Sequence, residues 1–161
     1  MTELQQKALR WCPTSDIPET PCYDFSLESS GMRQLRLTLQ YSKIRGNPYR
    51  DLLLIFSDVR AFRCYWDGDG VDLATPRPVC ANPVFEGHPW PLLTIENSLW
   101  IASADFGSSR YVAEAFAEDP WQHVRVLTLE RHLDVMARGA LAAEWINSPP
   151  RRAPSSPGSA G

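Results

Sequence analysis

Residues 51–72 read DLLLIFSDVRAFRCYWDGDGVD, and this stretch decides the fold class. Five consecutive apolar residues, 52–56, lead into a β-branched and aromatic run that ends after Trp66 at a Gly/Asp turn. Such a run predicts a core strand that continues into an edge strand or hairpin. Ser57 and Asp58 interrupt the apolar run, so we expect a bulge or bend near Asp58 that changes which face is buried.

The segment before this stretch predicts a second strand. Leu35, Leu37, Leu39 and Tyr41 alternate with polar residues, which is the period of a half-buried strand. A break at 46–48 separates the two patterns, and we expect the two strands to pair antiparallel across it.

Outside these two strands, turn and capping residues divide the chain into shorter elements. We expect helices at 2–11, at 108–118 and from Thr128 to Gly139, and strands at 92–95, 99–103, 124–128 and 143–146. The fold class predicted is α+β, a single domain over residues 1–147. It would hold a mostly antiparallel sheet of about five or six strands with two or three helices on one side. Residues 148–161 are rich in Pro and Ser and predict a disordered tail.

Composition favours an ordinary soluble domain. The chain has 161 residues, of which 43% are hydrophobic, and a net charge of −3. No apolar run reaches the roughly 18 residues of a membrane-spanning helix, and the N-terminal residues lack the apolar stretch of a secretory signal. We therefore expect a cytoplasmic protein without a membrane partner. Residues 31–65 are rich in Lys and Arg and residues 66–120 in Asp and Glu, and strands from the two parts are expected to neutralise each other.

No metal site or cofactor is expected from the residue spacings. The four cysteines (Cys12, Cys22, Cys64, Cys80) and the three histidines (His88, His123, His132) lack the spacings of zinc ligands. Residues 67–72, DGDGVD, lack the later ligands of an EF-hand calcium loop, so a solvated turn explains them better.

No catalytic residue is predicted either. The chain contains neither a Gly-x-Ser-x-Gly elbow nor a phosphate-binding glycine loop. His123 falls on the polar phase of a strand, where a surface position is expected. A small hydrolase with a site assembled non-locally from Asp, Glu and His, for example from Asp58, Glu96 or His123, stays open as an alternative.

Aromatic residues favour a binding surface. The chain has six tryptophans, and Trp90 lies in a His-Pro-Trp-Pro loop whose prolines would pre-order it. Trp90 is therefore the candidate anchor for a protein partner, although it could instead plug an open end of the sheet. The candidate acidic rim around that anchor consists of Asp105, Glu114, Glu118 and Asp119. The next surface to consider is the basic strand face of Arg33, Arg36, Arg60 and Arg63. The acidic balance argues against a nucleic-acid partner.

Four segments carry a resemblance to a known group of proteins. They are LRLTLQY (35–41), LLIFSDVRAFRCYWD (53–67), WQHVRVLTLERHLDVMA (121–137) and EWI (144–146). Their distribution resembles that of small bacterial proteins of the immunity type, from polymorphic and contact-dependent toxin systems. The resemblance implies a single α+β domain that works by binding, most specifically a toxin-neutralising immunity protein that acts by surface complementarity. A subunit of a permanent complex is a further alternative.

Overall fold

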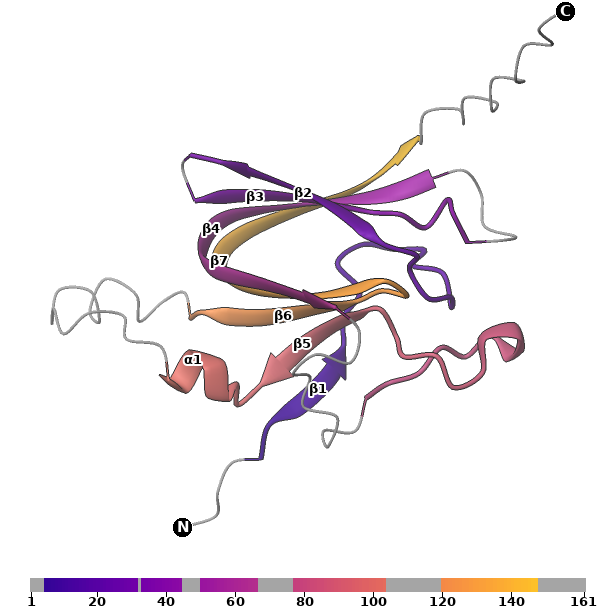
Figure 1. The fold of residues 1–161 in the computed structure, drawn as a ribbon. Coiled ribbons are helices and arrows are strands. Elements are labelled where there is room, and N and C mark those ends of the chain that lie inside the picture. Colours follow the sequence, from indigo (N-terminus) through magenta and orange to yellow (C-terminus); the bar gives the residue numbers. More distant parts are fainter. Residues whose placement is uncertain (1–4, 32, 45–49, 67–76, 104–119, 148–161) are drawn as a thin grey trace, which may run out of the picture.

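The computed structural model describes residues 5–31, 33–44, 50–66, 77–103 and 120–147 (Figure 1). These residues form one seven-stranded sheet with the order β1-β5-β6-β7-β4-β3-β2, in which every neighbouring pair is antiparallel. The strands are β1 (Lys7–Arg10), β2 (Phe25–Ser30), β3 (Gln34–Leu39), β4 (Arg50–Trp66), β5 (Leu92–Glu96), β6 (Gln122–Leu127) and β7 (Arg131–Asn147). Two short helices lie between strands, η1 (Pro83–Phe85) and α1 (Leu99–Ser103).

The two 17-residue strands β4 and β7 bend together at their middle, which confirms the bulge predicted near Asp58. The pairing register shifts between Phe56 and Asp58 and again between Val59 and Ala61. Gly139 sits in the first irregularity with φ +80°, a conformation that glycine adopts without steric cost. The bend converts one sheet into two stacked layers.

The layers differ in their strands (Figure 1). The first layer contains β2, β3, residues 50–56 of β4 and residues 141–147 of β7, because β3 pairs with β4 only as far as Phe56. The second layer contains β1, β5, β6, residues 58–66 of β4 and residues 131–138 of β7. One cluster of buried residues draws on both layers, with Leu37 and Leu54 from the first and Val126 and Leu133 from the second fully buried.

The prediction of two paired N-terminal strands is confirmed. Leu35, Leu37 and Leu39 alternate as buried residues along β3, and β3 runs antiparallel to β4. Strands predicted at 92–95 and 124–128 correspond to β5 and β6. The strand predicted at 143–146 is the end of β7, which finishes at Asn147, and the predicted tail at 148–161 lies outside the described residues.

The predicted α+β class with two or three helices is wrong for the described part of the chain, where the one α-helix has five residues. Residues 7–10 of the first predicted helix form β1, and the segment after Thr128 forms β7. Leu133, Val135 and Ala137 alternate there with Asp134 and Met136, and pairing on both sides with β4 and β6 favours the extended form.

A segment that was predicted as a strand is instead a helix. Residues 99–103, predicted as a strand, form α1. The helix predicted at 108–118 lies outside the described residues. Among the residues that are described, no helix is long and apolar enough to cross a membrane.

Candidate functional site

A row of charged side chains crosses the second layer at Asp134. Asp134 of β7 is the direct strand partner of Arg63 on β4 and of Arg125 on β6. Partners directly opposite each other on a sheet project to the same face with their Cβ atoms about 5 Å apart. Strand alternation therefore brings one carboxylate between two guanidinium groups, on the side of β7 opposite to Leu133 and Val135.

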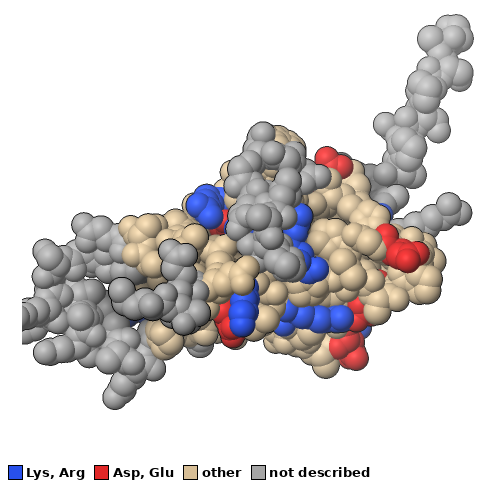
Figure 2. Space-filling model, turned by 90° about the horizontal axis from the view of Figure 1, so that it is seen from below, with Lys and Arg blue, Asp and Glu red and all other residues tan. Residues whose placement is uncertain are grey.

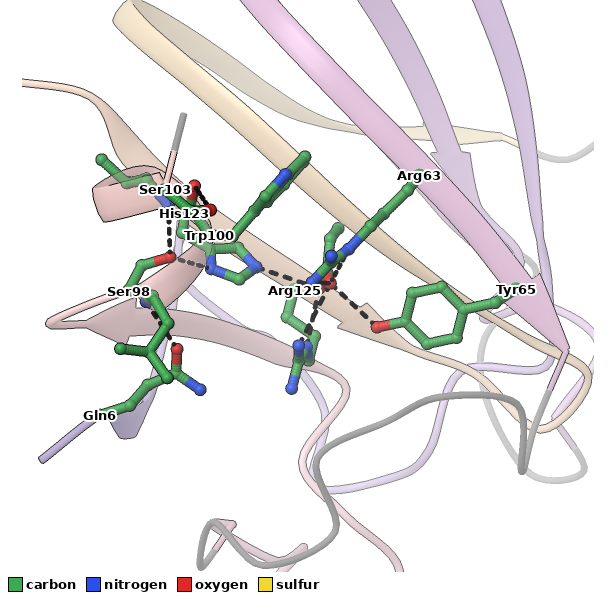
Figure 3. A network of polar contacts seen from close by, with 11 residues as sticks. Gln6, Arg63, Tyr65, Ser98, Trp100, Ser103, His123 and Arg125 are labelled. Carbon is green, nitrogen blue, oxygen red and sulfur yellow. Dashed lines mark hydrogen bonds and ion pairs between the residues drawn. The ribbon is translucent and has the colours of Figure 1, made fainter. Parts of the chain in front are cut away.

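The Asp134 carboxylate accepts hydrogen bonds from Arg63, Tyr65 and Arg125, whose side chains converge in Figure 3. Arg125 donates from Nε to Oδ1 at 2.7 Å and from Nη2 to Oδ2 at 3.1 Å. Arg63 donates from Nε to Oδ2 at 2.9 Å, and the Tyr65 hydroxyl donates to the same oxygen at 3.0 Å. Asp134 is 0% exposed and Arg125 is 4% exposed, so most of these contacts lie away from water.

The network shifts the pKa values of its acidic members. Burial by itself raises the pKa of Asp134, but the close contact with His123, the hydrogen bonds from Arg125 and the positive charge of Arg125 outweigh it, so the pKa lies below its ordinary value. Burial and the neighbouring Asp134 carboxylate raise the pKa of Tyr65 to about 12. Asp134 is therefore ionised and Tyr65 is neutral near pH 7.

A chain of polar contacts leads from Asp134 to Ser98. His123 Nε2 lies 3.1 Å from Asp134 Oδ1, although outside the limits of a well-directed hydrogen bond. His123 Nδ1 lies 2.7 Å from Ser98 Oγ. Because Ser98 Oγ also accepts from the Ile101 backbone N–H at 3.2 Å, its hydroxyl proton is available to His123. In the tautomer with its proton on Nε2, the ring accepts from Ser98 Oγ at Nδ1 and turns the Nε2 proton toward Asp134.

Helix α1 packs against these polar contacts. The Trp100 ring meets the His123 ring edge-on with centroids 5.2 Å apart, and the Arg63 guanidinium lies 4.5 Å from the centroid of the Trp100 ring. At the start of the helix, Gln6 Oε1 accepts from the Leu99 backbone N–H at 3.0 Å. The network thus ties α1 and the residues before β1 to the sheet (Figure 3).

Beside this network lies a groove of about 930 Å³. Ser98 and His123 contribute polar atoms to its lining. Its apolar lining includes Trp11, Ile95, Ile101 and Trp121. Both Ser98 and His123 are buried, at 6% and 2% exposure. The groove therefore reaches the edge of the network without opening it widely to solvent.

The order Ser98, His123, Asp134 matches the sequence of roles in a nucleophile–base–orienter site. Two features weaken that chemistry. The negative charge of Asp134 is already balanced by two guanidinium groups, and the hydroxyl of Ser98 also caps α1. Those features suit a network that fixes the position of α1, β6 and β4.

Trp90, the predicted exposed anchor, is fully buried. Its Nε1 donates to the Trp11 carbonyl at 3.2 Å, and the Arg10 guanidinium lies 3.6 Å from the ring centroid. The anchor prediction is therefore wrong, and the alternative of a ring that plugs the sheet describes Trp90 better. The reason is that burial of so large a ring outweighs the proline-rich local sequence. The other predicted site residues, Asp105, Glu114, Glu118 and Asp119, lie outside the described residues.

The four arginines of the basic strand face do not form one continuous surface. Arg36 lies 3.9 Å from Glu28, and Arg63 belongs to the Asp134 network. Arg33 and Arg60 do come together, because both line a second groove of about 300 Å³ with the apolar residues Leu35, Val59 and Phe62. This groove lies where β3 separates from β4.

Beyond that groove, β4 is an outer strand. The Val59 N–H still donates to the Arg33 carbonyl at 2.8 Å, but β3 has no paired residue beyond Leu35, which faces Phe56. From Ala61 to Trp66, the ladder within the described residues runs only to β7. Phe62 and Trp66 are 41% and 63% exposed on this strand. Within the described residues, the second half of β4 is therefore an open edge with two exposed aromatic side chains.

The sequence contained one signal for the Asp134 network. Asp134 stands among apolar residues in the segment HLDVMA, and a charged residue inside a buried strand needs a charged partner. His123, which was expected at the surface, is instead buried beside Asp134. In the described part of the chain, all four cysteines are free thiols and no group of three His, Cys, Asp or Glu is arranged to hold a metal.

Neither a protein-family model nor a curated protein matches this chain. No solved structure matches it either.

Proposed function

We propose that this protein is a cytoplasmic protein-binding module and, as the resemblance in its sequence implies, a toxin-neutralising immunity protein. The observation that supports binding is the open edge of β4, where Phe62 and Trp66 are exposed on a strand that, in the described part of the sheet, is paired with β7 alone. Large aromatic side chains at a surface are the usual anchors of protein interfaces.

The Asp134 network supports the same proposal. Arg63 and Tyr65 alternate with Phe62 and Trp66 along β4 and are both bonded to the buried Asp134 carboxylate. The network therefore holds the backbone of the open edge in place before a partner arrives. A rigid edge loses little conformational entropy on association, which favours affinity.

The proposal predicts a toxin domain encoded by a neighbouring gene, and the direct test is neutralisation of that domain. Expressed alone, that domain should stop growth, and co-expression of this protein should restore it. A double variant, Phe62→Ser with Trp66→Ser, should weaken the complex at least about tenfold, as loss of anchors does. Val84→Ser is the matched control, because Val84 is an exposed apolar residue (80%) in η1, outside the β4 edge.

Growth that stays arrested, with no complex between the two purified proteins by calorimetry, would refute the proposal. An equal loss of affinity in the Val84→Ser control would show that the aromatic residues of β4 are not the anchors.

A second candidate function is favoured by a specific observation, the contacts that link Ser98, His123 and Asp134 beside an apolar groove. In a hydrolase of this type, Ser98 Oγ would attack the carbonyl carbon of an ester while its proton passes to His123 Nδ1. The departing alcohol would then take that proton, and water would release the acyl group by the reverse steps.

A fluorophosphonate probe separates this candidate from the first. Covalent labelling of Ser98, lost in Ser98→Ala and retained in Ser103→Ala, would support the hydrolase. Ser103 is a fair control because its hydroxyl donates to the Trp100 carbonyl in the same helix. A folded protein that stays unlabelled would exclude a reactive serine, and the balanced charge of Asp134 favours that outcome.

A further inference from the structure

The open edge of β4 also indicates what kind of segment binds there. We propose, on the basis of the proposed function, that β4 takes up an extended, acidic segment of the partner protein as an added antiparallel strand. The contact would extend from Ala61 to Trp66. Strand addition of this kind gains affinity from main-chain hydrogen bonds and specificity from alternate side chains.

The other outer strands fit this role less well. β2 presents exposed polar residues, Ser26, Glu28, Ser29 and Ser30, and carries no exposed aromatic ring. β1 has four residues and one exposed large apolar side chain, Leu9. Among the edges of the described sheet, the second half of β4 combines unpaired backbone groups with two exposed aromatic residues.

The same edge is protected against a second copy of this chain. Native sheets block self-pairing with bulges and with charged residues on their edge strands. β4 has both, because the register shift between Val59 and Ala61 falls at Arg60, and Arg63 follows three residues later. Two copies paired edge to edge would bring these arginines together. An acidic strand meets no such repulsion.

Charge favours an acidic segment. The paired segments 58–66, 122–127 and 131–138 contain five arginines and two aspartates; the arginines are Arg60, Arg63, Arg125, Arg131 and Arg138, and the aspartates are Asp58 and Asp134. Arg131 is neutralised by Asp24 at 3.0 Å, whereas Asp58 and Asp134 are each shared by two arginines, so the positive excess comes from these shared pairs and from Arg60. Figure 2 shows several Lys and Arg side chains on the face seen from below, with Asp and Glu side chains at its right and lower margins and beside some of the basic ones. Such a positive excess attracts acidic partners and raises association rates.

Side-chain alternation sets the pattern of the incoming strand. Phe62, Cys64 and Trp66 project to one face of β4 and are all exposed, whereas Arg63 and Tyr65 project to the other. An added strand with apolar residues on the first face would cover the two aromatic rings. Acidic residues on the second face would lie near Arg63.

The groove at the start of the open edge fits the end of such a strand. Arg33 and Arg60 flank it, and Leu35, Val59 and Phe62 supply its apolar surface. An acidic side chain beside an apolar one satisfies both kinds of surface. The open edge and the groove are continuous, because Ala61 and Phe62 belong to both.

Two synthetic peptides test the inference. One alternates glutamate with valine and the other alternates lysine with valine, and both carry a fluorophore for anisotropy measurements. The glutamate peptide should bind and should slow amide hydrogen exchange in residues 61–66, while the lysine peptide should not bind. Arg60→Glu should weaken binding of the glutamate peptide about tenfold or more. Lys43→Glu, the same charge change at an exposed residue outside β4, should leave it unchanged.

Three results would contradict the proposed strand addition. Failure of the glutamate peptide to bind, unchanged exchange in 61–66, or equal binding by Arg60→Glu would do so. A concentration-dependent dimer of the free protein that involves 61–66 would assign the edge to a second copy instead. Neutralisation of the neighbour-encoded toxin without protection of 61–66 would overturn this inference and leave the proposed function intact. Protection of 61–66 by the glutamate peptide without neutralisation of the toxin would support strand addition and contradict the proposed function.

Discussion

Arg125 and Asp134 face each other across the β6–β7 ladder, and two hydrogen bonds of 2.7 and 3.1 Å join the guanidinium to the carboxylate. Both side chains are almost completely buried, at 4% and 0% exposure. A buried pair of this kind contributes little over apolar residues of similar size. Loss of one partner, however, leaves an unpaired charge out of water.

The first prediction concerns this pair. Asp134→Asn should lower the free energy of unfolding by about 3 kcal/mol, because Arg125 would stay buried without a counter-charge. Urea denaturation measures the change. The double variant Arg125→Met with Asp134→Leu should recover most of the loss, since Arg63 is 48% exposed at its side chain and can turn to water. A cost below about 1 kcal/mol for Asp134→Asn would mean that water reaches the network.

The second prediction concerns the stability of the protein at low pH. The pKa of Asp134 is lowered in the folded protein from an unfolded value of about 4, so the folded state binds this proton less readily than the unfolded chain. Its contribution to stability is fully present above about pH 4 and is lost as the pH falls toward the folded-state pKa. The stability difference between the wild type and Asp134→Asn should therefore shrink as the pH falls below about 4. A difference that does not depend on pH would contradict the assignment.

The third prediction concerns the bend of β4 and β7. Gly139→Ala should destabilise the protein by about 1–2 kcal/mol, because φ at this position is +80° and a Cβ atom is strained there. Gly31→Ala is the control, since an added Cβ at Gly31 meets no atom within 4 Å and its φ is not in that region. Thermal unfolding of both variants measures the difference. Equal melting temperatures would show that the bend does not depend on glycine.

The fourth prediction concerns the centre of the first layer. Leu54 is fully buried on β4 between β3 and β7, so Leu54→Ala should cost about 2–5 kcal/mol. Val84→Ala, at an 80% exposed position, should change stability by less than about 0.5 kcal/mol. A cost below about 1 kcal/mol for Leu54→Ala would place this strand outside the core.

The parts of the fold that were predictable from sequence depend on short-range patterns. The alternation of Leu35, Leu37 and Leu39 and the apolar run at 52–56 each favour an extended strand with a buried face, and both strands form where predicted. The bulge near Asp58 was predictable because polar residues interrupt the run. Each of these patterns is complete within a few residues.

Local patterns misled where two structures fit the same residues. Leu129, Leu133 and Met136 suit one stripe of a helix, and Leu133, Val135 and Ala137 suit one face of a strand. Backbone pairing with β4 on one side and β6 on the other selects the strand over the helix. Trp90 was similarly ambiguous between surface and interior, and its contacts with Arg10 and Trp11, distant in sequence, place it inside.

The sequence by itself determined that this domain contains a sheet with a long central strand, because hydrophobic periodicity acts over neighbouring residues. Only the tertiary structure decided that Arg63, Arg125 and Asp134 meet and that half of β4 lies at an edge of the described sheet. Both results depend on which strands become neighbours. That order arises from burial and backbone pairing summed over the whole sheet, and no single segment encodes it.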